Sequence, residues 1–316
     1  MSLDRVELGR TGIEVSRLCL GTLPMNQSGM SAQEGADLIV RAWEMGISFV
    51  DTAVVYRTHE HVRIARSRLP GLVVATKSHA ATYEEMDKDV SRCIEELGGG
   101  TIDIFLLHGA RARAGVLSQR AGALQCLMDA KRAGRIRAVG ISTHHISVVR
   151  EAGLHQDIDV IHPLINMAGL GIADGGVEEM AQAIDEASRR GKGIYLMKTL
   201  AGGNLIPRRE EALRFAASLP GVHCVAVGMV SVPELLVNTS IFEGRPIPED
   251  AAKQTKAGGE KWFLLAPACR GCGKCVEMCP SEALAIVDGK CRVDRARCVL
   301  CRYCGPVCPE FAIRFV

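Results

Sequence analysis

Eight of the thirteen cysteines form two copies of the spacing C-x2-C-x2-C-x3-C-P between residues 269 and 308. The first copy runs from Cys269 to Pro280 and the second from Cys298 to Pro309. One such run alone would also suit zinc, because C-x2-C pairs bind both zinc and iron–sulfur clusters. Two complete runs, each closed by Cys-Pro, favour two 4Fe-4S clusters. The segment is too small for a substantial apolar core, so we expect the clusters to hold it together.

The cysteine spacing resembles that of bacterial two-cluster ferredoxins, in which the fourth cysteine of each run binds the other cluster. The resemblance implies one ligand set of Cys269, Cys272, Cys275 and Cys308, and a second set of Cys298, Cys301, Cys304 and Cys279. Four other cysteines lie in apolar stretches and are expected to pack in a core (Cys19, Cys93, Cys126 and Cys224). Cys291 lies between the two runs, and the eight ligands are complete without it.

Length and composition restrict the class of protein. A chain of 316 residues with 47% hydrophobic and 23% charged residues suits one large globular domain and a small one. A net charge of +2 gives no reason to expect nucleic acid or an anionic membrane as partner. No apolar run reaches the roughly 18–20 residues of a membrane span, and the first residues lack the apolar region of a signal peptide. Because thiolate clusters need a reducing compartment, we expect a cytoplasmic protein.

Short apolar segments alternate with amphipathic ones over more than two thirds of the chain. The amphipathic segments have apolar residues at spacings of three and four and often end in glycine, as helices do. Eight strands each followed by a helix predict an α/β fold of the (β/α)8 TIM barrel type. Two doubly wound domains are the alternative, but the spacing is even and no linker interrupts it. The expected strands are 18–21, 47–51, 72–77, 102–108, 138–142, 159–165, 193–198 and 224–228.

Three segments make up the predicted domain organisation. The barrel is expected over residues 1–245 and opens with a hairpin. Residues 246–266 are rich in Pro, Gly and charge, which predicts a linker. Residues 267–316 are expected to form a small α+β ferredoxin-like domain around the two cysteine runs.

Protonatable side chains stand at the ends of three consecutive predicted strands. Asp51, Lys77 and His108 end the second, third and fourth strands, and Tyr56 follows Asp51 by five residues. In a barrel of this kind the chemistry gathers at the carboxyl ends of the strands. A Lys beside a Tyr is expected to lower the pKa of the phenol, and an Asp can hold that Lys in place. Such a set can perform acid–base chemistry on a carbonyl group.

The chain is identified as similar to the aldo-keto reductases over residues 4–242. The motifs that carry the resemblance occur in the family's order: LGRTGIEVSRLCLGT, FVDTAVVY, VVATK, DIFLLH, AVGIS and LMKTLAGGNL. The resemblance implies a catalytic tetrad of Asp51, Tyr56, Lys77 and His108. Tyr56 would be the general acid, Lys77 would tune it, Asp51 would support Lys77, and His108 would position the substrate.

The resemblance also implies a nicotinamide site, but only some of the family's residues at this site occur in this sequence. The matching positions are Ser142, Thr143, Asn166, Lys198, Gly228 and Asn238. The usual Gln is His162 here, and the acidic residue before the last Asn is Val237. A basic residue commonly grips the 2′-phosphate of NADP, but this sequence has Glu234, which would repel a phosphate. NAD(H), NADP(H) held by another base, and loss of the nicotinamide therefore stay open.

The function expected from these features is that of an iron–sulfur oxidoreductase. It would interconvert a small-molecule carbonyl or alcohol at the barrel mouth with electrons from the clusters, with or without NAD(P)H. A ferredoxin or another redox protein is an expected partner. One alternative is an electron-transfer protein that uses the barrel for docking, and the other is an NAD(P)H-dependent reductase with structural clusters. Arg111 and Arg113 could bind an acidic substrate group, although a solvated loop explains them equally well.

Overall fold

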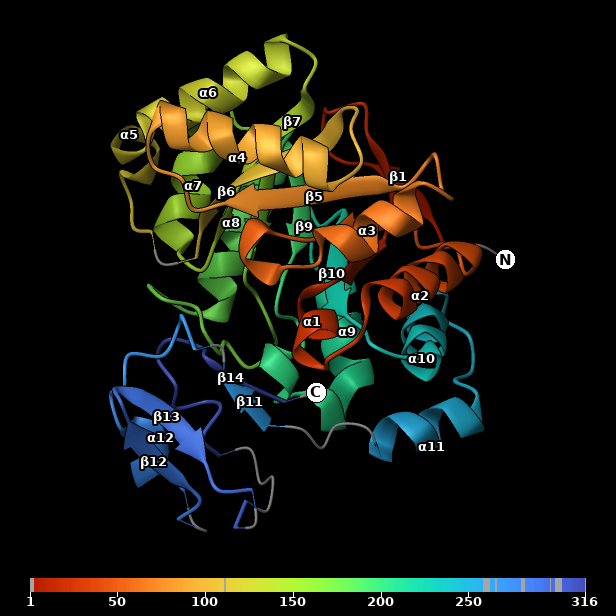
Figure 1. Cartoon of the computed structure of the whole chain (residues 1–316), viewed down its shortest axis with the longest axis vertical. Helices are drawn as coiled ribbons and strands as arrows, with labels where there is room; N and C mark the ends of the chain where they lie inside the picture. Colours follow the sequence, from red (N-terminus) through yellow and green to blue (C-terminus); the bar gives the residue numbers. More distant parts are fainter. Residues whose placement is uncertain are drawn as a thin grey trace.

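The computed structural model describes residues 3–110, 112–257, 262–264, 266–279, 282–295, 297–298 and 303–315. Figure 1 shows a large barrel with helices around it and a smaller domain, drawn in blue, at one end. Within the described residues, no helix is long and apolar enough to cross a membrane. The cytoplasmic location stays a prediction.

Eight parallel strands close the barrel, which confirms the predicted fold and excludes two doubly wound domains. Each strand pairs with the next along the chain, and β10 closes the ring by pairing with β3. The strands are β3 (Leu18–Gly21), β4 (Phe49–Asp51), β5 (Val73–Ser78), β6 (Ile102–Gly109), β7 (Ile136–Thr143), β8 (Val160–Pro163), β9 (Gly193–Leu196) and β10 (Cys224–Gly228).

The expected hairpin closes the amino end of the barrel. Strands β1 (Arg5–Glu7) and β2 (Glu14–Ser16) pair antiparallel. Leu8, Ile13 and Val15 of this region are buried against the side chains that fill the barrel, among them Phe49 and Tyr195. The ring centroids of Phe49 and Tyr195 lie 5.1 Å apart, edge to face. Because the hairpin covers one end, only the carboxyl ends of the strands are left for a site.

Amphipathic helices surround the barrel and bury their apolar faces on the strands. Ser31 and Thr82 each form a capping box at the start of a long helix, which fixes where α2 and α4 begin. The helices are α1 (Leu23–Gln27), α2 (Ala32–Glu44), η1 (Val54–Tyr56), α3 (His59–Arg66), α4 (Tyr83–Glu96), α5 (Val116–Gln119), α6 (Ala121–Arg132), α7 (Ile146–Leu154), α8 (Val177–Arg189), η2 (Ala201–Gly203), η3 (Ile206–Arg208), α9 (Arg209–Ser218), α10 (Val232–Phe242) and α11 (Glu249–Ala257).

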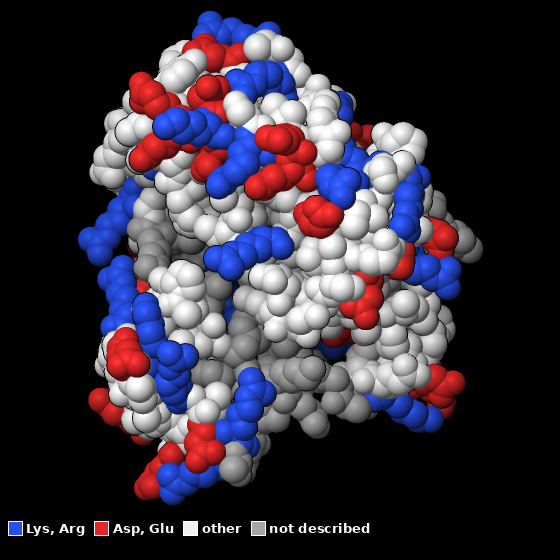
Figure 2. Space-filling model, viewed as in Figure 1, with Lys and Arg blue, Asp and Glu red and all other residues white. Residues whose placement is uncertain are grey.

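The outer helix faces carry both signs of charge. Figure 2 shows Lys and Arg intermingled with Asp and Glu over the region of α4 and α6. Arg92 pairs with Asp89 at 2.7 Å within α4, and Arg135 pairs with Asp87 at 2.6 Å. Such exposed pairs each contribute little to stability, and they leave no single-sign patch on this part of the surface.

Within its described residues, the C-terminal domain contains two small antiparallel sheets and one short helix. Strand β11 (Trp262–Leu264) pairs with β14 (Ile313–Phe315), and β12 (Leu284–Val287) pairs with β13 (Lys290–Val293). Helix α12 (Lys274–Glu277) follows the start of the first cysteine run. The segment predicted as a linker, 246–266, includes helix α11 beside α10 and strand β11. The exact domain boundaries stay a prediction.

Phe311 joins the C-terminal domain to the barrel. It is buried in a small apolar cluster with Ala201, Leu205 and Ala212, which belong to the segment after β9. A Cβ atom at Gly171 or at Gly202 would lie 2.9 Å from the Phe311 ring, and both glycines have positive φ angles. Because these two loops lie at the carboxyl ends of β8 and β9, the C-terminal domain lies beside the barrel mouth (Figure 1).

Candidate active site

Asp51, Lys77, His108 and Tyr56 converge at the carboxyl end of the barrel. Asp51 is the last residue of β4, and Lys77 and His108 are each the next-to-last residue of β5 and β6. Tyr56 ends the single turn η1 that follows β4. Because parallel strands end at the same edge, side chains far apart in the sequence meet there.

Lys77 and Asp51 form a buried ion pair. The Lys77 Nζ atom lies 2.6 and 2.7 Å from the two Asp51 oxygens and donates to the Thr52 carbonyl at 2.8 Å. Only 1% of the Lys77 side chain and 6% of the Asp51 side chain are exposed. The Tyr195 hydroxyl donates to Asp51 Oδ1 at 3.0 Å. Burial alone lowers the pKa of Lys77, but the charges of Asp51 and Tyr56 outweigh it and the net pKa is raised.

Tyr56 lies over this ion pair. The Lys77 Nζ atom is 4.9 Å from the centroid of the Tyr56 ring. Burial raises the pKa of Tyr56 above its usual value, and Lys77 lowers it only in part. The expected effect of Lys77 is therefore present but smaller than the effect of burial. Tyr56 holds its proton at neutral pH and can act as a proton donor.

His108 of β6 lies beside Tyr56. Its ring is 6.3 Å from the Tyr56 ring in an edge arrangement and stacks on His79 with centroids 4.0 Å apart. Burial, together with the nearby His79 and Lys77, lowers the pKa of His108 well below its usual value. Its buried Nδ1 atom has no hydrogen-bond partner among the described residues. A neutral imidazole with a free nitrogen can orient a carbonyl group.

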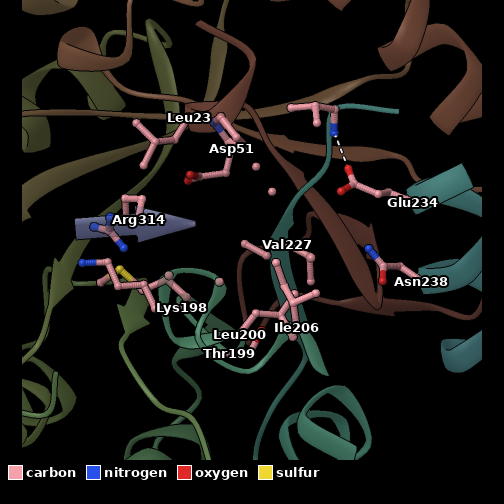
Figure 3. A pocket seen from close by; sticks show the side chains of 18 of the residues that line it. Leu23, Asp51, Lys198, Thr199, Leu200, Ile206, Val227, Glu234, Asn238 and Arg314 are labelled. Carbon is pink, nitrogen blue, oxygen red and sulfur yellow. Dashed lines mark hydrogen bonds between the residues drawn. The ribbon is translucent and has the colours of Figure 1, made fainter. Parts of the chain in front are cut away.

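One pocket connects this cluster to the start of α10. Asp51 and Tyr56 line one end of it, while Glu234 and Asn238 line the other. Figure 3 shows the loop of Lys198, Thr199 and Leu200 along one wall, with Val227 and Ile206 beside it.

Several polar atoms around the pocket lack partners. Thr199 Oγ1, Asn238 Oδ1 and Arg209 Nε, all of residues that line the pocket, are buried without a hydrogen bond among the described residues. The Ser142 hydroxyl, near the carboxyl end of β7, is also buried without one, although Ser142 does not line the pocket. Buried polar atoms usually have a partner, so these atoms fit a ligand that supplies one. Ser142 and Asn238 are two of the positions predicted to hold a nicotinamide dinucleotide.

Other predicted nicotinamide contacts already have partners within the protein. The Asn166 amide donates to the Leu170 carbonyl at 2.8 Å, and its oxygen accepts from the Leu170 amide at 3.1 Å. Thr143 Oγ1 accepts from the backbone of His145 at 3.0 Å. Gly228 ends β10, where a Cβ atom would lie 2.7 Å from Pro24. The roles proposed for these residues stay predictions.

Glu234 forms hydrogen bonds within its own segment, at the start of α10. Its carboxylate accepts from the Val230 amide at 2.7 Å, and its own amide donates to the Ser231 hydroxyl at the start of α10. Burial raises the pKa of Glu234, while Arg209 lowers it in part. Arg209 lines the pocket as well, and no sequence pattern indicated a role for this residue.

Two basic residues lie near the reactive cluster: Lys198, predicted as a nicotinamide contact, and Arg314, which was not predicted. Arg314 of β14 lines the same pocket as Asp51 and Tyr56. The Lys198 Nζ atom donates to His144 Nε2 at 2.9 Å. Arg113, predicted as a substrate contact, is exposed, and Arg111 lies outside the described residues. The only sequence signal for Arg314 was its place in a short C-terminal β-like stretch.

Residues 17–211 match the model of the aldo/keto reductase family. The chain belongs to this family. Residues 268–312 match the 4Fe-4S dicluster domain, which confirms that the C-terminal domain holds two clusters. We therefore refer to it as the dicluster domain.

Curated relatives of this aldo/keto reductase match only part of the barrel. A 6-dehydroglucose reductase of Novosphingobium aromaticivorans is 24% identical over 43% of this chain and 50% of its own length. The methylglyoxal reductase DkgA of Yersinia pestis is 22% identical over 52% of this chain and 62% of its own length. The chain thus spans about half of the first relative and under two thirds of the second.

Solved structures share the fold. The holo form of aldo-keto reductase AKR11C1 from Bacillus halodurans has a TM-score of 0.64 at 18% identity, covering 81% of this chain and 96% of its own. The Bombyx mori aldo-keto reductase AKR2E4 in complex with NADP has a TM-score of 0.59 at 15% identity, covering 81% and 93%. At these identities the likeness shows the fold alone.

Several cysteines of the dicluster domain lie in one packed cluster. Cys269, Cys275 and Cys304 are buried together, and Cys279 and Cys308 pack against them. Cys272 is exposed and Cys298 is half-buried. Cys301 lies outside the described residues. The folded chain itself therefore brings five of the predicted ligands together.

The two cysteine runs repeat one local geometry. Cys279 Sγ accepts a hydrogen bond from the Ala283 amide at 3.3 Å, and Cys308 Sγ accepts one from the Ala312 amide at 3.3 Å. The residues just before these alanines, Glu282 and Phe311, both have a φ angle of 50°. Amide hydrogen bonds to sulfur stabilise cluster thiolates, so the residues present fit two clusters.

Cys291 contacts two cysteines of the first predicted ligand set. Its Sγ atom is 3.4 Å from Cys275 Sγ, and its amide donates to Cys269 Sγ at 3.4 Å. The Cys291 amide thus contacts the predicted ligand Cys269, although the Cys291 thiol is not needed to complete the eight predicted ligands.

We expect Cys275→Ser and Cys291→Ser to differ in iron content. Wild-type protein should bind about eight iron atoms per chain, and Cys275→Ser should lose about four because one cluster lacks a ligand. Cys291→Ser should keep about eight, since its amide contact to Cys269 is retained. Iron analysis and EPR of anaerobically purified protein would measure both. Loss of a cluster in the Cys291 variant would contradict the ligand sets.

We expect Lys77→Met to destabilise the barrel by about 3–5 kcal/mol, because it leaves the Asp51 carboxylate buried without its partner. The double variant Asp51→Asn/Lys77→Met should recover part of that loss. Urea unfolding followed by far-UV circular dichroism would give the free energies.

Lys131→Met provides the matched control for Lys77→Met. Lys131 pairs with Asp159 at 2.7 Å, but 43% of the Lys131 side chain is exposed. Its loss should therefore cost about 1 kcal/mol or less. Equal losses of unfolding free energy in Lys77→Met and Lys131→Met would contradict the importance assigned to the buried pair of Lys77 and Asp51.

His162 should make the barrel sensitive to acid. Burial lowers its pKa from the usual 6.5 to about 4. The unfolded chain therefore takes up this proton at a higher pH than the folded chain. The neutral His162 side chain therefore contributes fully to the free energy of unfolding above pH 6.5. This contribution, about 3 kcal/mol, is lost as the pH falls toward 4. Unfolding free energies between pH 7 and 4 should fall less steeply in His162→Gln; an unchanged slope would refute this.

Proposed function

We propose that this protein is an iron–sulfur oxidoreductase that interconverts a small carbonyl compound and its alcohol at the barrel mouth. One observation carries the proposal. Strand β14 of the dicluster domain lines the same pocket as Asp51 and Tyr56, and it begins five residues after the cluster ligand Cys308. A cluster domain that contributes to the pocket wall is placed to deliver electrons there.

The four side chains supply the proton chemistry. Reduction of a carbonyl to an alcohol takes two electrons and two protons. Tyr56 gives one proton to the carbonyl oxygen, and the Lys77 ammonium stabilises the phenolate that remains. The second hydrogen reaches the carbonyl carbon within the hydride of a nicotinamide, or as a proton from solvent when the clusters supply the electrons. Asp51 holds Lys77, while the neutral His108 orients the carbonyl. The names of the relatives, a 6-dehydroglucose reductase and a methylglyoxal reductase, support a small carbonyl substrate.

The electrons have two candidate sources. When bound, 4Fe-4S clusters supply electrons singly, whereas a nicotinamide supplies a hydride. The partnerless Asn238 Oδ1 and Arg209 Nε support a dinucleotide, and Arg209 offers the base that Glu234 does not. The contribution of β14 to the pocket wall, through Arg314, supports the clusters as the electron source. We therefore keep an NAD(P)H-dependent reductase as the second candidate.

The source can be identified by anaerobic titration with NADH, NADPH and reduced ferredoxin, with cluster absorbance and EPR as readouts. Reduction of the clusters by ferredoxin together with substrate turnover would support the proposal. Turnover with NAD(P)H while the clusters stay in one redox state would support the second candidate. Turnover with none of the three would overturn both.

Tyr56→Phe should lower turnover by about 10²- to 10⁴-fold, because the variant lacks the proton donor. Cluster reduction by ferredoxin should be unchanged. Tyr83→Phe is the matched control, since Tyr83 is exposed on α4 and its hydroxyl contacts Asp129 at 3.2 Å. Wild-type turnover in the Tyr56 variant would remove Tyr56 from the mechanism.

A further inference from the structure

Arg314 is a buried cation that projects from the dicluster domain into the pocket of the barrel. Only 6% of the residue is exposed, and it lines the pocket together with Asp51, Tyr56 and Lys198. Figure 3 shows its guanidinium group between Asp51 and Lys198. We propose that Arg314 binds a substrate carboxylate, so that the substrate is an oxo acid or the corresponding hydroxy acid. This inference deepens the proposed function and rests on it.

Arg314 lacks the partner that a buried arginine needs. Its Nε atom is buried without a hydrogen bond among the described residues, and no carboxylate of those residues lies within ion-pair distance of it. Its guanidinium carbon lies 4.7 Å from the Phe311 ring centroid. A stacked guanidinium keeps its donors in a fixed plane, which suits a two-point contact with a carboxylate. The position therefore favours an anionic ligand.

Lys198 adds a second cation at the same ring. Its Nζ atom lies 4.7 Å from the Phe311 centroid and donates to His144. The neighbouring His144 and His108 do not add positive charge, because burial lowers the pKa of each well below its usual value. Two cations on one ring thus make this wall of the pocket positive.

The position relative to Tyr56 indicates where the substrate's charge lies. Arg314 and Tyr56 line the same pocket. Burial raises the pKa of the Tyr56 hydroxyl, and the Arg314 charge lowers it in part. A carboxylate on Arg314 would then place a carbonyl a few bonds away beside Tyr56. A short oxo acid fits both contacts, whereas a neutral carbonyl compound would leave Arg314 unpaired.

The test compares binding of oxamate with binding of its neutral methyl ester by calorimetry, in the oxidised holoprotein. Neither compound needs to react, so the result does not depend on turnover. Oxamate should bind at least roughly 10-fold more tightly than the ester, because only oxamate pairs with Arg314. Equal affinities would overturn the proposal, even if every variant failed to fold.

Variants then assign the effect to Arg314. Arg314→Gln should weaken oxamate roughly 10- to 100-fold and leave the ester unchanged, and Arg314→Lys should be intermediate because it keeps the charge but not the planar fork. Arg292→Gln, an exposed arginine on β13, is the control for loss of one charge from the same domain. Iron content would verify that each variant holds both clusters. Wild-type oxamate affinity in Arg314→Gln would overturn the assignment.

A dinucleotide diphosphate is the other anion that could reach this wall. The same calorimetry with inorganic pyrophosphate and NADPH separates the two sources. Weaker pyrophosphate or NADPH binding in Arg314→Gln, with oxamate unaffected, would overturn the proposal in favour of a cofactor contact. Oxamate binding that depends on Arg314, in a protein that reduces no carbonyl, would instead refute the proposed function and keep the carboxylate site.

Discussion

The buried ion pair between Lys77 and Asp51 determines how the barrel mouth is built. Neither charge is exposed enough for water to stabilise it, so each must be satisfied by neighbouring groups. The Thr52 carbonyl and the Tyr195 hydroxyl do this from two sides. Tyr195 in turn packs on Phe49 inside the barrel. The site is therefore continuous with the barrel core. Tyr56 lies over the Lys77 ammonium, which its hydrogen bonds hold in one position.

The dicluster domain uses an internal repeat for two different purposes. The same turn follows Cys279 and Cys308, with a residue of positive φ and then an amide that donates to sulfur. In the first run the residue of positive φ is Glu282, which is exposed. In the second run it is Phe311, which packs into the barrel loops. One local geometry thus follows the last predicted ligand of each run, and in the second run it also packs the domain against the barrel.

The sequence predicted most of what depends on local pattern. The eight strands follow from apolar segments of regular spacing, and Asp51, Lys77 and His108 stand at strand ends that a closed barrel must bring together. The pKa of Tyr56 was not predictable in the same way, because it depends on how deeply the ring is buried. Arg209 and Arg314 were also missed. Their place in the pocket follows from the packing of segments distant in sequence, which has no periodic signal.

The place of Arg314 in the fold links cluster assembly to the pocket. A small metal-binding domain depends on its metal for stability, so the position of β14 depends on both ligand sets being filled. Phe311 and Arg314 share one short segment after Cys308, and the ring that docks the domain also supports the guanidinium. The pocket wall is therefore complete only when the dicluster domain is assembled. A barrel without clusters would keep its ion pair and Tyr56, but it would lack the cation contributed by the second domain.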